Sequence, residues 1–225
     1  MSKQLQPNFS TQWFLVQICG SIALTLVTQA IVTLIILLLH IDNLLGIYSL
    51  RFLGFSLSHT IQGYLQWQTL KQVVKTLDRQ WIYTSLCGLP INILTWGLIN
   101  LGIETLIVDE DGTVIVILAI VGAVSGGING LMIGSWQKSL FKKSLNWRSL
   151  WHDWDREQLL AGALSGIIIS VITIGSVLLF GKNWIASPLS GFICSLGLAS
   201  ISQVIYGLIV GDSIHDIFIQ AKLIK

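Results

Sequence analysis

Long apolar runs alternate with short polar connections along the whole chain. Each run approaches the roughly 20 apolar residues that cross the hydrocarbon core of a bilayer, so the pattern predicts an all-α polytopic membrane protein. We predict six transmembrane helices in a single membrane domain, residues 1–225. They run from Trp13 to about Leu39, about Tyr48 to Trp67, Trp81 to about Leu101, Val114 to Trp136, Leu159 to Phe180 and Trp184 to about Val210.

One phrase recurs at the start of the odd-numbered predicted helices. Gln12–Gly20 reads QWFLVQICG, Gln80–Gly88 reads QWIYTSLCG, and a weaker copy, QLLAGALSG, covers Gln158–Gly166. The recurrence predicts three tandem helical hairpins, with repeats over about 12–70, 80–140 and 158–215. Chance similarity among short interfacial segments that contain tryptophan is the alternative.

The basic residues predict the orientation of these hairpins. Of the 13 Lys and Arg residues, all but Arg51 and Lys182 lie before the first predicted span, after the sixth, or in the connections after the second and fourth. Cytoplasmic connections retain such residues, so both termini are expected in the cytoplasm. Arg51, near the outer end of the second span, is expected to extend toward the headgroups.

Composition agrees with a lipid environment and excludes one class of partner. Hydrophobic residues make up 53% of the chain and charged residues 11%, which leaves too little polar surface for a soluble globule of this length. The formal net charge of +2 is too small to indicate nucleic acid. The expected partner is the lipid bilayer, with another membrane or cytoplasmic protein as a further one.

Small residues at intervals of four predict close helix packing. The fourth predicted span carries four glycines on one face, the sixth has small residues at the same spacing, and the second ends in a glycine. In lipid such faces let backbones approach each other. The alternatives are a glycine-lined pathway or an interface with a partner. The predicted packing residues are Gly122, Gly126, Gly130, Gly134, Gly63, Gly207 and Gly211.

Neutral polar residues lie within several predicted spans. The first span presents a stripe at intervals of four, and residues of the third and sixth spans could face it. Such side chains usually link neighbouring helices, and a hydrated path for a neutral solute is the alternative. The residues of this polar stripe and its counterparts are Gln17, Ser21, Thr25, Gln29, Asn92 and Gln203.

The end of the second predicted span carries a resemblance to known proteins. Residues 63–71 read GYLQWQTLK, which resembles the Gly-x-x-Gln-Trp-x-x-Leu-Lys/Arg helix endings of uncharacterised multi-pass bacterial membrane proteins. The fourth span keeps Gly134 and Gln137 but has Lys138 in place of the tryptophan. The resemblance implies a bacterial multi-pass protein, in the inner or an internal membrane, and no activity.

The predicted spans offer little catalytic chemistry. They contain no Asp or Glu, although ion-coupled carriers and intramembrane carboxyl proteases usually place ionisable groups there. His59 is the one histidine at depth, and a role as a pigment or metal ligand is the alternative to a hydrogen bond with a neighbouring helix. The three cysteines lack paired metal-ligand spacing. We therefore expect no catalytic residues, no metal site and no cofactor.

The connection after the fourth predicted span is longer than its counterpart after the second. Residues 137–157 place tryptophans and bases at helical spacing, which predicts an amphipathic helix on the cytoplasmic surface. Trp147, Trp151 and Trp154 are the expected contacts with the membrane surface or with a docking partner.

Two function classes follow from these patterns. The first is a noncatalytic integral membrane scaffold, anchor or assembly subunit. The second is a channel or facilitator for a small neutral solute. The environment of the polar stripe distinguishes them, because a pore requires these residues around a continuous lumen, whereas a scaffold packs them against neighbouring helices.

Overall fold

The computed structural model describes residues 9–41, 43–88, 90–91, 94, 98, 113–145, 154–181, 201, 204–210 and 214. All regular structure within these residues is helical, which confirms the predicted all-α class. Residues 204–210 form a short helical segment. The other elements are α1 (Phe9–Leu15), the π-helical turn η1 (Val16–Gly20), α2 (Ser21–Leu38), α3 (Leu44–Val73), the 3-10 helix η2 (Arg79–Leu86), α5 (Thr113–Leu145) and α6 (Trp154–Phe180).

Three helices in the described part of the chain are long and apolar enough to cross a membrane, and not six. They cover Thr11–Leu38, Ile115–Leu145 and Trp154–Phe180, with 28, 31 and 27 residues. These helices correspond to the first, fourth and fifth predicted spans, and they support a multi-pass membrane protein in contact with lipid. The third and sixth predicted spans lie largely outside the described residues.

The second predicted span is a helix but is not among these three. Helix α3 has 30 residues, enough to cross a bilayer by length. Its sequence is less apolar because it includes Arg51, His59 and several amide side chains. Helix α3 is therefore long enough to cross a membrane, but its composition is not apolar enough to place it among the three candidate spans.

Local chemistry fixes the ends of these helices. Asn43 caps α3, and its side chain accepts a hydrogen bond from the Gly46 N–H at 2.6 Å. Helix α6 ends at Gly181, which adopts a φ of +78° that favours glycine, and whose N–H bonds the Val177 carbonyl at 2.7 Å. These caps set the turn between α2 and α3 and the end of α6.

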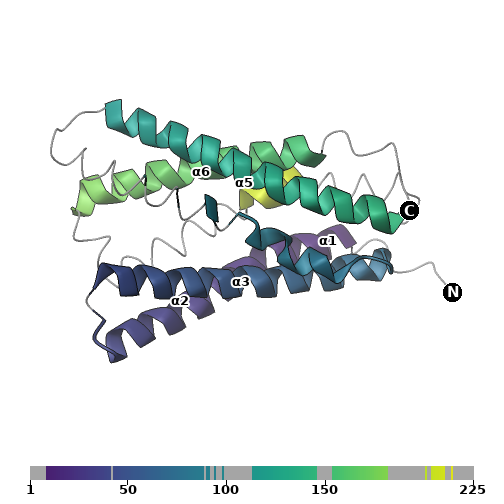
Figure 1. The fold of residues 1–225 in the computed structure, drawn as a ribbon, viewed down its shortest axis with the longest axis horizontal. Coiled ribbons are helices and arrows are strands. Elements are labelled where there is room, and N and C mark those ends of the chain that lie inside the picture. The colour runs from purple at the N-terminus through teal and green to yellow at the C-terminus, as the bar shows by residue number, and fades with distance from the viewer. Residues whose placement is uncertain are drawn as a thin grey trace.

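The helices form two antiparallel pairs (Figure 1). One pair is α1–η1–α2 against α3, and the other is α5 against α6. Helix η2 contacts both α3 and α5 and so lies between the pairs. We call the end of the bundle where α3 and α5 end and η2 and α6 begin the basic end.

A hydrophobic cluster joins α1, α3, η2, α5 and α6 at the basic end. It includes the first and last described residues, Phe9 and Ile214, together with residues from α3, η2, α5 and α6. Its aromatic centre is Phe141, whose ring lies 4.7 Å from that of Trp81 and 6.2 Å from that of Trp154, measured between centroids. The cluster therefore holds the starts and ends of several helices on one side of the molecule.

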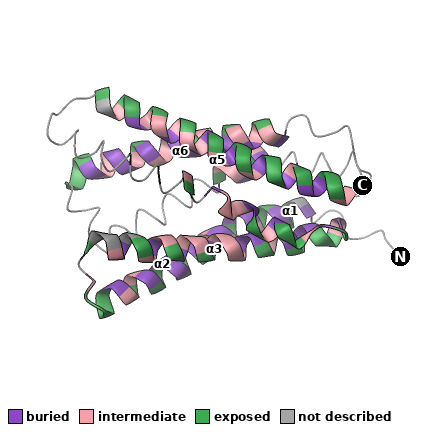
Figure 2. Ribbon diagram, viewed as in Figure 1, coloured by how far each residue is buried: buried purple, intermediate pink, exposed green. Residues whose placement is uncertain are grey.

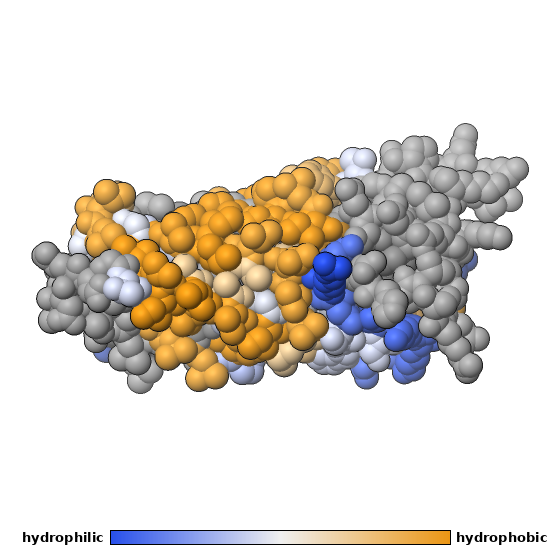
Figure 3. Space-filling view, turned by 90° about the horizontal axis from the view of Figure 1, so that it is seen from above, coloured by the Kyte–Doolittle hydropathy of each residue, from blue (hydrophilic) through white to orange (hydrophobic). Residues whose placement is uncertain are grey.

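Along the long helices, polar side chains are buried and large apolar side chains are exposed. Gln29 is fully buried, whereas Leu38 and Leu179 are 68% and 78% exposed. Exposed and buried residues alternate around each helix (Figure 2), and apolar side chains cover most of the face away from the basic end (Figure 3). An apolar exterior with polar side chains inside is what a hydrocarbon environment favours.

Candidate helix-packing site

The closest helix contact is between α5 and α6. A Cβ atom added at Gly122, Gly126 or Gly130 would overlap the α6 carbonyl groups of Gly166, Gly162 and Gln158, respectively. At Gly134 it would meet the Gln158 side chain at 2.8 Å. We call this contact the glycine seam.

The glycine seam is reciprocal. A Cβ at Gly162 would overlap the Gly126 carbonyl, and one at Gly166 would overlap the Gly122 carbonyl. The α6 side of the seam, Gln158, Gly162, Gly166 and Ser170, thus has the same spacing of four as the α5 side. Backbones this close gain van der Waals contact and weak Cα–H donors without any side chain between them.

Two other predicted packing glycines also lie at close contacts. A Cβ at Gly63 of α3 would overlap the Ile82 carbonyl of η2. A Cβ at Gly207 would meet Ile18 Cδ1 at 2.9 Å, so residues 204–210 lie against the first long helix. Gly211 is outside the described residues.

The polar stripe of the first helix faces α3 rather than lipid. Gln17, Ser21, Thr25 and Gln29 are all buried. Gln66 Nε2 donates to Gln17 Oε1 at 2.6 Å. Thr28 lies beside the stripe and bonds carbonyls of its own helix, at 2.7 Å to Leu24 and 3.2 Å to Thr25. Asn92 and Gln203 lie outside the described residues.

Arg51 corrects a prediction. It does not extend toward the headgroups but is buried, with 7% exposure. Its Nη1 donates to Gln29 Oε1 at 3.3 Å, and Gln29 Nε2 lies 3.5 Å from the Arg51 carbonyl. The neighbouring helix supplies an oriented amide dipole that hydrocarbon lacks, so the guanidinium group turns inward.

The π-helical turn η1 has a partner on α3. A π-turn inserts one residue into a helix and displaces the usual backbone hydrogen bonds around it. Gln62 Nε2 donates to the Val16 carbonyl at 2.7 Å and to that of Gln17 at 3.4 Å. Gly20 leaves room for this side chain, because a Cβ there would lie 3.3 Å from Gln62 Oε1. The irregular backbone is thereby satisfied inside protein, as a membrane interior requires.

The Gly-x-x-Gln endings of α3 and α5 make matching contacts. Each glycine packs on the helix that follows it: Gly63 of α3 packs on Ile82 of η2, and Gly134 of α5 packs on Gln158 of α6. Each glutamine forms a hydrogen bond with the helix that precedes it: Gln66 of α3 with η1, and Gln137 of α5 with η2.

The two glutamine contacts lie at neighbouring positions of the recurring phrase. Gln66 bonds Gln17 in the first copy, and Gln137 Nε2 bonds Thr84 Oγ1 in the second at 3.2 Å. Gln17 and Thr84 are the sixth and fifth residues of their copies. The Gly-x-x-Gln ending therefore joins three consecutive helices in both places.

The position after the glutamine explains the departure at Lys138. In α3 the indole Nε1 of Trp67 donates to the Leu77 carbonyl at 3.2 Å, just before η2. In α5 the Lys138 ammonium group pairs with Asp155 at 2.7 Å, at the start of α6. Both side chains hold the start of the next helix, Trp67 through a hydrogen bond and Lys138 through an ion pair.

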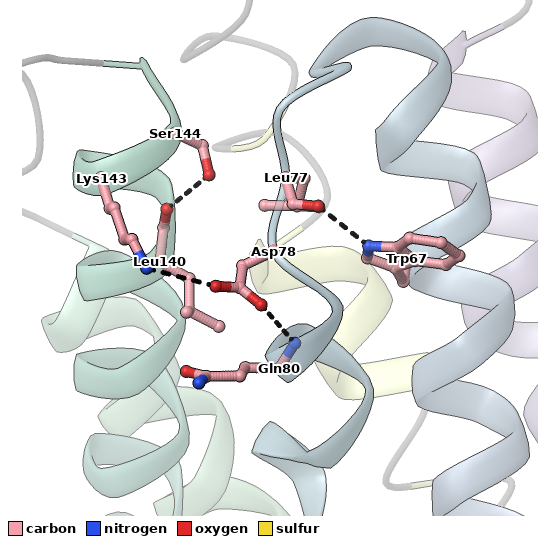
Figure 4. A network of polar contacts seen from close by, with 7 residues as sticks. All are labelled: Trp67, Leu77, Asp78, Gln80, Leu140, Lys143 and Ser144. Atoms are coloured by element: carbon pink, nitrogen blue, oxygen red, sulfur yellow. Dashed lines mark hydrogen bonds and ion pairs between the residues drawn. The ribbon is translucent and has the colours of Figure 1, made fainter.

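Asp78 forms a polar network at the basic end (Figure 4). Its Oδ1 accepts the Gln80 N–H at 3.0 Å, and its Oδ2 lies 3.3 Å from Lys143 Nζ. The hydrogen bond from the Gln80 N–H, followed by the nearby Lys143 ammonium group, lowers the pKa of Asp78 against an opposing rise from desolvation. Thr76 Oγ1 also donates to the Ser144 carbonyl at 2.8 Å, so this network joins the α3–η2 connection to the end of α5.

Trp154 is buried, although the predicted amphipathic helix would expose it. Its exposed fraction is 2%, and its ring meets that of Phe141 edge-on. Helix α5 also continues to Leu145, with Leu140 and Phe141 in the core. The apolar residues at both ends of the 137–157 segment therefore pack inside the bundle. Trp147 and Trp151 lie outside the described residues.

The predicted ligand His59 makes a backbone contact. Its carbonyl accepts the Ser85 hydroxyl at 3.1 Å, which ties α3 to η2. No group of three or more His, Cys, Asp or Glu residues that could hold a metal occurs among the residues the structure describes. Cys19 is exposed and Cys87 is partly buried, and both are free thiols.

Sequence reasoning missed several residues of this site. Gln62 and Gln158 were not selected, although each lies four residues before another small or polar residue that makes a helix contact. The sequence signal that could have identified them is a spacing of four residues. It relates Gln62 to Gln66 on α3, and it continues from Gln158 to Ser170 on α6.

Comparison with known proteins adds no assignment. No family model, no curated protein and no solved structure matches the chain. The class that the fold defines is an all-α multi-pass membrane protein.

Proposed function

We propose that the protein is a noncatalytic integral membrane scaffold or assembly subunit in a bacterial inner or internal membrane. The observation that carries the proposal is the environment of the polar stripe. Gln17 and Gln29 are buried and hydrogen-bonded to α3, so these side chains serve helix association. The alternative, a facilitator for a small neutral solute, needs the same side chains to face water.

The proposed topology has six spans in three hairpins, with both termini in the cytoplasm. Helix α3 would be the second span, because hydrogen bonds from Gln66 and Arg51 hold it against the first long helix at Gln17 and at Gln29. The matching Gly-x-x-Gln contacts support the tandem repeat. The basic end would face the cytoplasm, since Lys71, Lys142 and other bases lie there.

Native mass spectrometry after gentle extraction tests the scaffold directly. We expect a companion protein at fixed stoichiometry, retained by the wild type and lost by Gly126→Leu, which disrupts the glycine seam. Gly175→Leu is the control, because a side chain at Gly175 would meet nothing within 4 Å. Repeated isolation of the chain alone would contradict the proposal.

Vesicle flux measurements test the alternative. Purified protein in liposomes should give no faster swelling in glycerol or urea than empty liposomes. Flux that is abolished by Gln29→Leu and unaffected by Ala30→Leu would favour the facilitator, because Gln29 is buried in the polar stripe and Ala30 is exposed on the same helix.

A further inference from the structure

We propose that the end of α3 binds the phosphate headgroup of an anionic phospholipid in the cytoplasmic leaflet. The binding groups are Lys71 and Arg79, which lie over the Trp67 ring, and the exposed Lys75, which lies between them in the sequence. The proposal rests on the proposed function only for its topology, in which the basic end faces the cytoplasm.

Trp67 holds two bases in place. Lys71 Nζ lies 4.4 Å from the centroid of the Trp67 ring, and the Arg79 guanidinium carbon lies 5.9 Å from it. The ring is itself buried and fixed by its hydrogen bond to the Leu77 carbonyl (Figure 4). Cation–π contact thus positions two long, flexible side chains before any ligand arrives.

These bases have no carboxylate partner among the residues that the structure describes, where the ion pairs are Lys138–Asp155 and Lys143–Asp78. Asp78, the nearest acid in sequence to Arg79, is engaged by Lys143 and the Gln80 N–H. Lys71, Lys75 and Arg79 are exposed, so their positive charge is available to an external anion.

The exposed stripe of α3 fits a lipid rather than a soluble anion. Leu53 and Leu57 are 61% and 55% exposed, and Tyr64 follows on the same face with 43% exposure. Tyr64 lies seven residues before Lys71, or about 10 Å along the helix at 1.5 Å per residue. Apolar, aromatic and basic side chains therefore follow one another as acyl chain, interface and phosphate do in a phospholipid.

The end of α5 supplies a matched internal control. At the equivalent positions of the repeat, Lys142 corresponds to Lys71 and Arg156 to Arg79, but Lys138 replaces Trp67. Lys138 is paired with Asp155, and Glu157 adds a second acid to the first turn of α6. The end of α5 therefore has similar basic residues, but no tryptophan ring beneath them and more acidic residues nearby.

Lipid retention measured by native mass spectrometry tests the proposal. The full chain is placed in nanodiscs that contain equal amounts of phosphatidylglycerol and phosphatidylcholine, and retained lipids are counted. We expect the wild type to retain phosphatidylglycerol preferentially. Each base contributes about five-fold to this preference, the equivalent of about 1 kcal/mol. Lys71→Gln with Arg79→Gln should therefore lower it by more than ten-fold, and Lys142→Gln with Arg156→Gln by less than two-fold.

Two results would overturn the lipid site. One is equal retention of both lipids by the wild type, and the other is an equal loss of preference in the two double variants. Soluble glycerol phosphate is added in a separate arm, and displacement of the retained lipid by it at millimolar concentration would assign the site to a free phosphate ester. Reporter fusions at residue 75 test the topology independently, because a non-cytoplasmic reporter would contradict the proposed orientation whatever the lipid result.

Discussion

The two helix pairs are held together by opposite means. Helices α5 and α6 meet at the glycine seam, whose centre is a contact of backbone with backbone at Gly126 and Gly162. The first long helix and α3 meet through amide side chains, Gln17 with Gln66 and Gln29 with Arg51. The comparison shows two solutions to one problem, because lipid removes the hydrophobic force that drives helices together in water.

The two solutions differ in what they tolerate. A backbone contact has no flexible atom that can move aside, so any added side chain must separate the helices. An amide contact can lose one hydrogen bond while the helices remain in place. We therefore expect substitutions in the glycine seam to cost more than substitutions in the amide network.

The largest effect is expected at the centre of the glycine seam. Gly126→Leu places a side chain against the Gly162 carbonyl, and Gly166→Leu places one against that of Gly122. Each should lower the free energy of unfolding by more than about 3 kcal/mol, at or beyond the upper range for overpacking. Unfolding in mixed detergent micelles measures this.

Gly175→Leu is the matched control for that experiment. It lies on α6 like Gly166, but a Cβ there meets nothing within 4 Å. Equal stability of the Gly166→Leu and Gly175→Leu variants would show that the two helices do not depend on backbone contact.

A smaller loss is expected at the buried guanidinium group. Gln29→Leu removes the side chain that accepts from Arg51 and should cost about 1.5–3 kcal/mol, the range for a hydrogen bond to a charged group. Replacing both residues, with Arg51→Leu, should restore part of this loss, because no charge then remains buried. A double-mutant cycle measures the coupling, and a coupling of zero would mean that the two side chains act independently.

The Gly-x-x-Gln contacts should show still smaller and similar effects. Gln66→Leu removes one hydrogen bond between helices and Gln137→Leu removes two, one to Thr84 and one from Gln158. About 0.6 kcal/mol is the mean for such a bond in a membrane protein. Gln68→Leu, on the exposed face of α3, is the control. If only one of the two variants differs in stability from the control, the two Gly-x-x-Gln contacts are not energetically equivalent.

The smallest effect concerns pH and the Asp78 network. The pKa of Asp78 is lowered in the folded protein, so its stabilising contribution is present above the unfolded-state pKa of about 4 and is lost as the pH falls through the lower folded-state value. Asp78→Asn should therefore reduce the decline in stability between about pH 5 and pH 2. Thermal unfolding of both proteins across this range measures it, and identical pH profiles would contradict the assignment.

Periodicity predicted part of this structure and missed what depends on tertiary contact. The glycine face of α5 was evident from its spacing of four, but its counterpart on α6 was hidden within a copy of the recurring phrase. Arg51 was assigned to the headgroups because its partner, Gln29, lies on another helix. A side chain's direction depends on neighbours that sequence spacing alone does not identify.

Local backbone geometry was also beyond sequence patterns. The three copies of one phrase adopt different geometries: π-helical at Val16–Gly20, 3-10 at Arg79–Leu86 and α-helical within Trp154–Phe180. The differences follow from their neighbours, since Gln62 supplies the donor that the π-turn needs and the glycine seam keeps α6 regular. Recurrence of a sequence thus did not predict a shared conformation.

The shared cluster at the basic end has a consequence for how such a chain could have grown. Phe9 and Ile214 lie in the same cluster, so the described part of the chain begins and finishes on one side of the molecule. A unit that returns to its starting side can be duplicated or deleted without inverting the rest of the molecule. In the proposed topology of three hairpins, the addition of one hairpin would therefore leave the orientation of the others unchanged.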